Sequence, residues 1–154
     1  KEPDRFGALV LTAPPTAWET RVAQSDTYNR MADALEQNDQ QTLAELFAQA
    51  TEPEIFAGML AEPLVPDIKP ELMPVIIRGA AATDLPSLAE IATINQETLL
   101  LPWASDPGHP VSTAVTLAET MRNSRLRIAH TAAQVKAYGA WSAGFLREVF
   151  TAKP

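Results

Sequence analysis

The residues best suited to chemistry stand in the segment 103–110, where Asp106 and His109 occur three positions apart. The chain has one other histidine, His130, and no cysteine. A carboxylate can accept a hydrogen bond from one imidazole nitrogen, fix the tautomer and stabilise the imidazolium. Asp106 and the two histidines are therefore the side chains here that could take part in acid–base chemistry. The alternative is that Asp106-Pro107-Gly108 is an ordinary turn, since these residue types favour turns.

Metal and phosphate chemistry find little support in the sequence. Two histidines far apart, without any cysteine, do not make a zinc site. The chain contains no Walker-type loop and no G-x-G-x-x-G pattern. We therefore expect neither a metal nor a cofactor.

Three short apolar runs, at 6–13, 98–103 and 125–129, predict the strands that would position these residues. Helical patterns separate the runs, and this alternation predicts an α/β fold with a parallel sheet and flanking helices. Ligands of such sheets bind outside the carboxyl ends of the strands. The segments to consider are therefore 104–110 and 130–131, which directly follow the second and third strands.

The helical patterns also have recognisable boundaries. A break at Asn38-Asp39 predicts two helices between the first two strands, and 113–121 has a helical pattern. Capping boxes at 51–54 and 87–90 predict two further short helices, the first burying Ile55, Phe56, Met59 and Leu60. Thr131 is expected to cap a final helix with one apolar stripe, formed by Tyr138, Trp141, Phe145 and Val149.

This order of elements, with an acidic residue shortly after the second strand, resembles the C-terminal half of an α/β-hydrolase-fold protein. The stretches that carry the resemblance are 11–21, the helix after Ser87, 98–110 and 126–150. The resemblance implies a partial α/β-hydrolase-like sheet with an inserted helical cap. Residues 1–15 would form a core strand, 16–71 the cap or lid, and 72–154 the C-terminal part of the α/β core.

The resemblance also implies a nucleophile, acid and histidine in that chain order, with the nucleophile on a G-x-S-x-G elbow after a strand. The chain has no such pattern, and Gly139 with Ser142-Ala-Gly144 has the wrong spacing inside the last helix. The chain also begins at Lys1 rather than at a methionine. We therefore expect a fragment whose partner is the missing N-terminal half. The intact protein would cleave a small ester, thioester or related acyl substrate.

Two registers compete for the catalytic histidine. In the favoured one, 98–103 is the penultimate strand, Asp106 is the acid, and His130 follows the last strand as the base. In the other, a short apolar run at 75–78 is the penultimate strand, and Gly108-His109 matches the family's Gly-His at the base. The second register puts Ala82 where the acid should be, so His109 is kept as the alternative base. A third reading is that neither histidine is catalytic.

Several other groups have two interpretations each. Trp18, Glu19 and Arg21 could bind a polar substrate group at the mouth of the site, or Glu19 and Arg21 could form an ordinary ion pair at a helix start. Apolar residues of the insertion could line an acyl pocket or only pack the cap onto the core: Met31, Leu35, Leu46, Phe47, Phe56 and Met59. Arg122, Arg125 and Arg127 have no aromatic residues between them and are expected to be a solvated surface feature.

Composition limits the function classes. With 46% hydrophobic and 20% charged residues, the chain is not a disordered protein, and no apolar run reaches the ~18–20 residues of a membrane span. A net charge of −7 argues against nucleic acid or an anionic membrane as partner. We expect a cytoplasmic protein, from a bacterium because alanine and arginine are frequent. The alternative to a hydrolase is a degenerate, non-catalytic binding module that self-associates through an exposed sheet edge.

Overall fold

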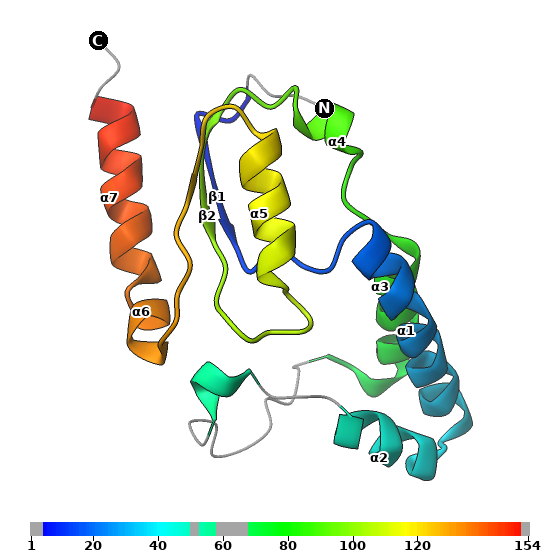
Figure 1. The fold of residues 1–154 in the computed structure, drawn as a ribbon. Coiled ribbons are helices and arrows are strands. Elements are labelled where there is room, and N and C mark those ends of the chain that lie inside the picture. Colours follow the sequence, from blue (N-terminus) through cyan, green and yellow to red (C-terminus); the bar gives the residue numbers. More distant parts are fainter. Residues whose placement is uncertain (1–4, 50–52, 58–67, 152–154) are drawn as a thin grey trace. The chain divides into compact units, whose positions relative to one another are not determined.

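The computed structural model describes residues 5–49, 53–57 and 68–151. These residues divide into two compact units (Figure 1). Unit 1 comprises the described residues of 1–15, 53–56 and 86–154, and unit 2 those of 16–52 and 57–85. Each unit is described by itself.

Unit 1 contains a sheet of three parallel strands in the order β1-β2-β3. The strands are β1 (Ala8–Thr12), β2 (Glu97–Leu101) and β3 (Ser124–Leu126). Residue Leu99 of β2 stands opposite Val10 on one side and Arg125 on the other. A bridge between Trp103 and Ala129 continues the β2–β3 pairing beyond the strands. The predicted α/β class and all three expected strands are confirmed.

Two helices of unit 1 begin where capping residues predict. Ser87 caps α4 (Leu88–Ile91) with the reciprocal hydrogen bonds of a capping box, and α5 (Val111–Thr120) follows the loop after β2. Thr131 accepts a hydrogen bond from the Gln134 N–H and caps α6 (Ala132–Lys136). The expected single final helix is in fact two, because α6 ends before α7 (Tyr138–Thr151) begins. Helices α5 and α7 lie on opposite sides of the strands in Figure 1.

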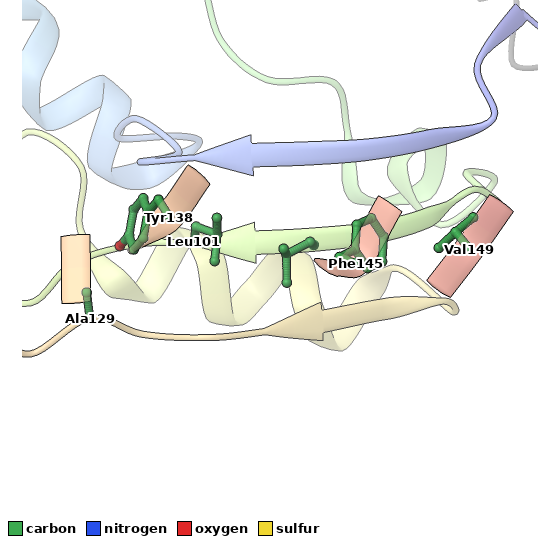
Figure 2. Packing of buried hydrophobic residues seen from close by; sticks show 6 residues of the cluster. Leu101, Ala129, Tyr138, Phe145 and Val149 are labelled. Carbon is green, nitrogen blue, oxygen red and sulfur yellow. The ribbon is translucent and has the colours of Figure 1, made fainter. Parts of the chain in front are cut away.

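The core of unit 1 forms where α7 packs on the sheet (Figure 2). Successive strand residues point to opposite faces, so Leu99 and Leu101 meet α7 while Leu100 points to the other face. From α7 the cluster receives Tyr138, Phe145 and Val149, and Trp141 packs against it. The predicted apolar stripe is therefore confirmed.

Unit 2 contains α1 (Glu19–Gln37), α2 (Gln40–Gln49), the short 3₁₀ helix η3 (Pro70–Leu72) and α3 (Met73–Ala82). The predicted break is confirmed, because Asn38 ends α1 in the left-handed conformation with φ 53°. The Asp39 carboxylate then accepts hydrogen bonds from the Thr42 N–H at 3.0 Å and the Thr42 hydroxyl at 2.7 Å, and so caps α2. Arg78 of α3 forms ion pairs with two carboxylates of α1, Asp33 at 2.6 Å and Glu36 at 2.7 Å.

The run at 75–78 is helical, not a strand, and lies inside α3. A proline suits the first turn of a helix, and Pro74 stands there. The register that used this run as the penultimate strand is therefore wrong. Of the short helix expected after the capping box at 51–54, the structure shows the 3₁₀ turn η2 (Glu54–Phe56), whereas residues 51–52, Met59 and Leu60 lie outside the described residues.

Within the described ranges, no helix has the length and apolar character needed to cross a bilayer.

The two phenylalanines of α7 test how much of the fold depends on the face toward the sheet. Phe145 is 5% exposed and Phe150 is 56% exposed. We expect Phe145→Ala to lower the free energy of unfolding by about 3–5 kcal/mol because it leaves a cavity in the core. The matched Phe150→Ala change should cost less than about 1 kcal/mol. Urea denaturation followed by circular dichroism measures both, and equal losses would contradict this packing.

Candidate functional site

The loop that carries Asp106 and His109 starts from a fixed point at the carboxyl end of β2. The Pro102 carbonyl accepts hydrogen bonds from the Ala129 N–H at 3.0 Å and from the buried Tyr138 hydroxyl at 2.7 Å. One residue further on, the Ala104 N–H donates to the Ala129 carbonyl at 2.9 Å. These bonds hold the start of the loop against both the β3 chain and α7.

Asp106 organises the loop that follows. One carboxylate oxygen, Oδ1, accepts hydrogen bonds from the Gly108 N–H at 2.9 Å and the His109 N–H at 3.1 Å. The other, Oδ2, accepts one from the Trp103 indole N–H at 2.7 Å. The turn expected at 106–108 is therefore present. The same carboxylate can also accept a hydrogen bond from a neighbouring side chain.

That neighbour is His109. Its Nδ1 lies 3.0 Å from Oδ2 of Asp106, whose side chain is only 9% exposed, whereas the imidazole is 44% exposed. Because a carboxylate only accepts, the tautomer that fits this contact carries its proton on Nδ1. The second nitrogen, Nε2, then holds a free lone pair and can accept a proton. Asp106 and His109 thus form an Asp–His pair with the chemistry of a general base.

His130 is in a different situation. It is exposed, and its backbone N–H donates to the Gln134 side-chain oxygen at 2.6 Å. Among the described residues its ring makes no hydrogen bond, and so none to Asp106. Thr131 caps α6 directly after it, which leaves His130 at the very end of the β3 chain. The structure therefore brings Asp106 together with His109 and does not bring it together with His130.

Trp18, Glu19 and Arg21 belong to unit 2. The Trp18 N–H donates to both oxygens of the Asp84 carboxylate, each at 2.9 Å. The Arg21 guanidinium donates to the Ala80 carbonyl at 3.4 Å and lies 5.7 Å from the Tyr28 ring centroid, while Glu19 is exposed. The contacts of Trp18 and Arg21 join the start of α1 to the end of α3 and the residues after it. A substrate-binding role for the three residues stays a prediction.

Sequence reasoning missed Trp103 and its aromatic neighbours. Besides the bond to Asp106, the Trp103 ring lies 6.0 Å from the His109 ring, centroid to centroid. Phe56 meets Trp103 edge-on at 5.5 Å and 74°, and Tyr138 lies 6.4 Å from it. The signal available in the sequence was a tryptophan, whose indole N–H can donate, three residues before an aspartate at a strand end. The Trp103 ring therefore lies beside the Asp–His pair, and Phe56 and Tyr138 lie next to Trp103.

In the part of the chain that the structure describes, no three His, Asp or Glu residues come close enough to hold a metal ion together.

Comparison with known proteins identifies the fold. No family model matches the chain. No curated protein matches it either. Among solved structures, a hydrolase from Pseudomonas aeruginosa PA01 superposes with a TM-score of 0.65 at 20% identity, covering 97% of this chain and 57% of that one. BpoC of Mycobacterium tuberculosis H37Rv, named as a non-heme bromoperoxidase, gives 0.61 at 15% identity, over 96% and 60%. An α/β-hydrolase from Sphaerobacter thermophilus DSM 20745 gives 0.54 at 20% identity, over 94% and 58%.

The fold is therefore α/β-hydrolase-like, with part of the parallel sheet and its flanking helices. The chain spans somewhat more than half the length of these relatives.

Tyr138 offers a pH test of the bond that fixes the end of β2. Burial raises its pKa from 10.0 to about 12. Between these values the unfolded chain releases the phenolic proton and the folded chain keeps it, so this contribution to stability is complete below pH 10 and is lost as the pH rises toward 12. Tyr138→Phe should abolish this loss of stability at high pH. It should also lower the free energy of unfolding at pH 8 by about 1 kcal/mol, the contribution of one hydrogen bond.

Urea denaturation at a series of pH values measures this effect. The difference between the tyrosinate absorbance titrations of the wild type and Tyr138→Phe isolates the group itself. A Tyr138 signal that titrates near pH 10 in the folded protein would contradict the buried hydrogen bond.

Proposed function

We propose that this chain supplies the acid and the base of a nucleophile–His–acid hydrolase that acts on a small ester, thioester or related acyl substrate. The observation that carries the proposal is the hydrogen bond between Asp106 Oδ2 and His109 Nδ1 at the carboxyl end of β2. The α/β-hydrolase-like fold supports it, because ligands of parallel α/β sheets bind at that end.

Each residue has a distinct role in this proposal. Asp106 orients the imidazole and stabilises its protonated form, as the acid of a triad does. His109 takes the proton of the nucleophile at Nε2 and returns it to the leaving group. The nucleophile comes from sequence outside this chain, since the chain has no G-x-S-x-G elbow. Trp103 and Phe56 provide an apolar wall for the acyl group.

His130 is the rival base. Its position after the β3 chain is the neighbourhood that the resemblance implies for a triad histidine, whereas His109 shares the loop of the acid. The distance of 3.0 Å between His109 and Asp106 favours His109.

A second candidate, a non-catalytic binding module, is favoured by a specific observation. Asp106 accepts two hydrogen bonds from backbone N–H groups of its own loop. In a binding module the Asp106 carboxylate would serve only to hold the loop. His109 would then only donate one further hydrogen bond to this carboxylate.

The natively expressed protein tests the proposal directly. Its intact mass is first compared with the 16.7 kDa of this chain, because a nucleophile outside the chain requires a heavier product. Hydrolysis of p-nitrophenyl acetate is then measured for the wild type and three variants. We expect His109→Ala and Asp106→Asn each to lower kcat/KM by about 100-fold or more, the usual worth of general acid–base catalysis.

His130→Ala is the matched control and should leave kcat/KM nearly unchanged. The opposite pattern, loss with His130→Ala alone, would transfer the role of base to His130. A native mass of 16.7 kDa, or activity indifferent to all three changes, would overturn the hydrolase proposal in favour of the binding module.

A further inference from the structure

We propose that the groove between β3 and α7 is a binding site for a small organic anion, a monocarboxylate with an apolar body, whose carboxylate is held by Arg127. The groove has a volume of about 400 Å³. Its strand side is formed by Arg125 and Arg127, and its helix side by Ala140, Trp141, Gly144 and Glu148.

The helix side leaves room for a ligand because two of its residues are small. Ala140 and Gly144 stand four residues apart, which places them on one face of α7. A Cβ atom added at Gly144 would meet nothing within 4 Å, so the space above this residue is open. An apolar ligand body could lie there, beside the Trp141 indole.

Arg127 is the group that makes this an anion site. Its guanidinium carbon lies 3.3 Å from the Trp141 ring centroid, so the cation is held against the indole face. The side chain is exposed, and among the described residues no carboxylate forms an ion pair with it. A stacked guanidinium keeps its in-plane N–H donors free, and their fork matches the two oxygens of a carboxylate.

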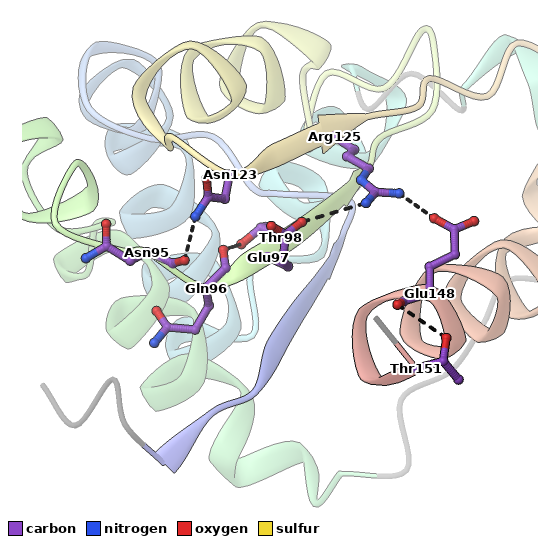
Figure 3. A network of polar contacts seen from close by, with 8 residues as sticks. All are labelled: Asn95, Gln96, Glu97, Thr98, Asn123, Arg125, Glu148 and Thr151. Carbon is purple, nitrogen blue, oxygen red and sulfur yellow. Dashed lines mark hydrogen bonds and ion pairs between the residues drawn. The ribbon is translucent and has the colours of Figure 1, made fainter. Parts of the chain in front are cut away.

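Arg125 differs from Arg127 although the two point to the same side of the β3 chain. Its guanidinium lies 5.4 Å from the Phe145 ring centroid. It also forms ion pairs with a Glu148 oxygen at 2.6 Å and a Glu97 oxygen at 3.8 Å (Figure 3). Two carboxylates thus already compensate this cation. Arg127 is left as the groove's free positive charge within the described part of the chain.

The Glu148 carboxylate decides which anion fits. Glu148 lines the groove, and its negative charge would repel a dianion such as a phosphate ester more strongly than a singly charged carboxylate. The apolar Leu99 and Phe145 also line it and favour an organic body over a bare inorganic ion. The chemistry therefore points to a monocarboxylate.

The structure changes the interpretation of Arg125 and Arg127 that the sequence suggested. Arg122, Arg125 and Arg127 were expected to be a solvated surface feature because no aromatic residue interleaves with them along the chain. In space, Trp141 and Phe145 of α7 lie beneath two of the three.

Benzoate is the probe for this site, and the indole N–H signals of Trp18, Trp103 and Trp141 in a ¹H–¹⁵N spectrum are the readout. Trp141→Phe assigns the third signal. We expect benzoate to shift the Trp141 signal saturably at constant ionic strength and to leave the Trp103 signal in place. Benzyl alcohol and inorganic phosphate should bind at least tenfold more weakly, because one lacks the charge and the other lacks the apolar body.

Variants separate binding from folding. Arg127→Ala should weaken benzoate binding at least tenfold, whereas the matched Arg122→Ala change, outside the groove, should not. Gly144→Leu fills the open space without removing any charge and should also abolish binding. If Arg127→Ala fails to fold, Gly144→Leu decides alone.

The proposal is overturned if benzoate gives no saturable shift, if phosphate binds more tightly, or if Gly144→Leu binds as the wild type does. Because the groove shares no residue with the Asp106–His109 pair, these results are independent of the esterase assay.

Discussion

Strand β2 is hydrogen-bonded to a parallel neighbour on each edge and covered by a helix on each face, and the rest of unit 1 depends on this position. Leu100 and Leu101 point to opposite faces and are fully buried, so both faces of the strand are covered. The constraint continues past the strand, because the Pro102 carbonyl is held by both Ala129 and Tyr138. The loop after β2 therefore starts from a fixed position. This restricts where Asp106, four residues after Pro102, can lie.

Asp106 organises the candidate site in the loop that starts from this anchored position. Its carboxylate joins the indole of Trp103, two backbone N–H groups and the imidazole of His109. Loop structure and acid–base geometry thus come from the same four hydrogen bonds, so neither interpretation of the segment excludes the other. On the α7 side, Tyr138 and Trp141 have ring centroids 5.5 Å apart and connect the packing beneath the loop with the Arg127 groove.

Much of the fold could be predicted from the sequence because its signals are local. Apolar runs marked the three strands, and Ser87, Thr131 and Asn38 marked helix ends through capping and left-handed backbone. The run at 75–78 was ambiguous because a short apolar segment fits a buried strand or a helix equally well, and Pro74 was the signal for the helix. Asp106 could be selected by its place after β2, but the choice between His109 and His130 depended on loop geometry. The Arg127–Trp141 contact joins residues from two elements, and no local pattern reports it.

The protonation of the His109 ring tests the account most directly. A long-range ¹H–¹⁵N spectrum distinguishes the two neutral imidazole tautomers, and His130→Ala leaves His109 as the chain's single histidine. We predict that His109 carries its proton on Nδ1, donated to Asp106, and that Asp106→Ala returns the ring to the Nε2–H form usual in water. A His109 that is already in the Nε2–H form in the wild type would contradict the Asp–His pair and with it the proposed base.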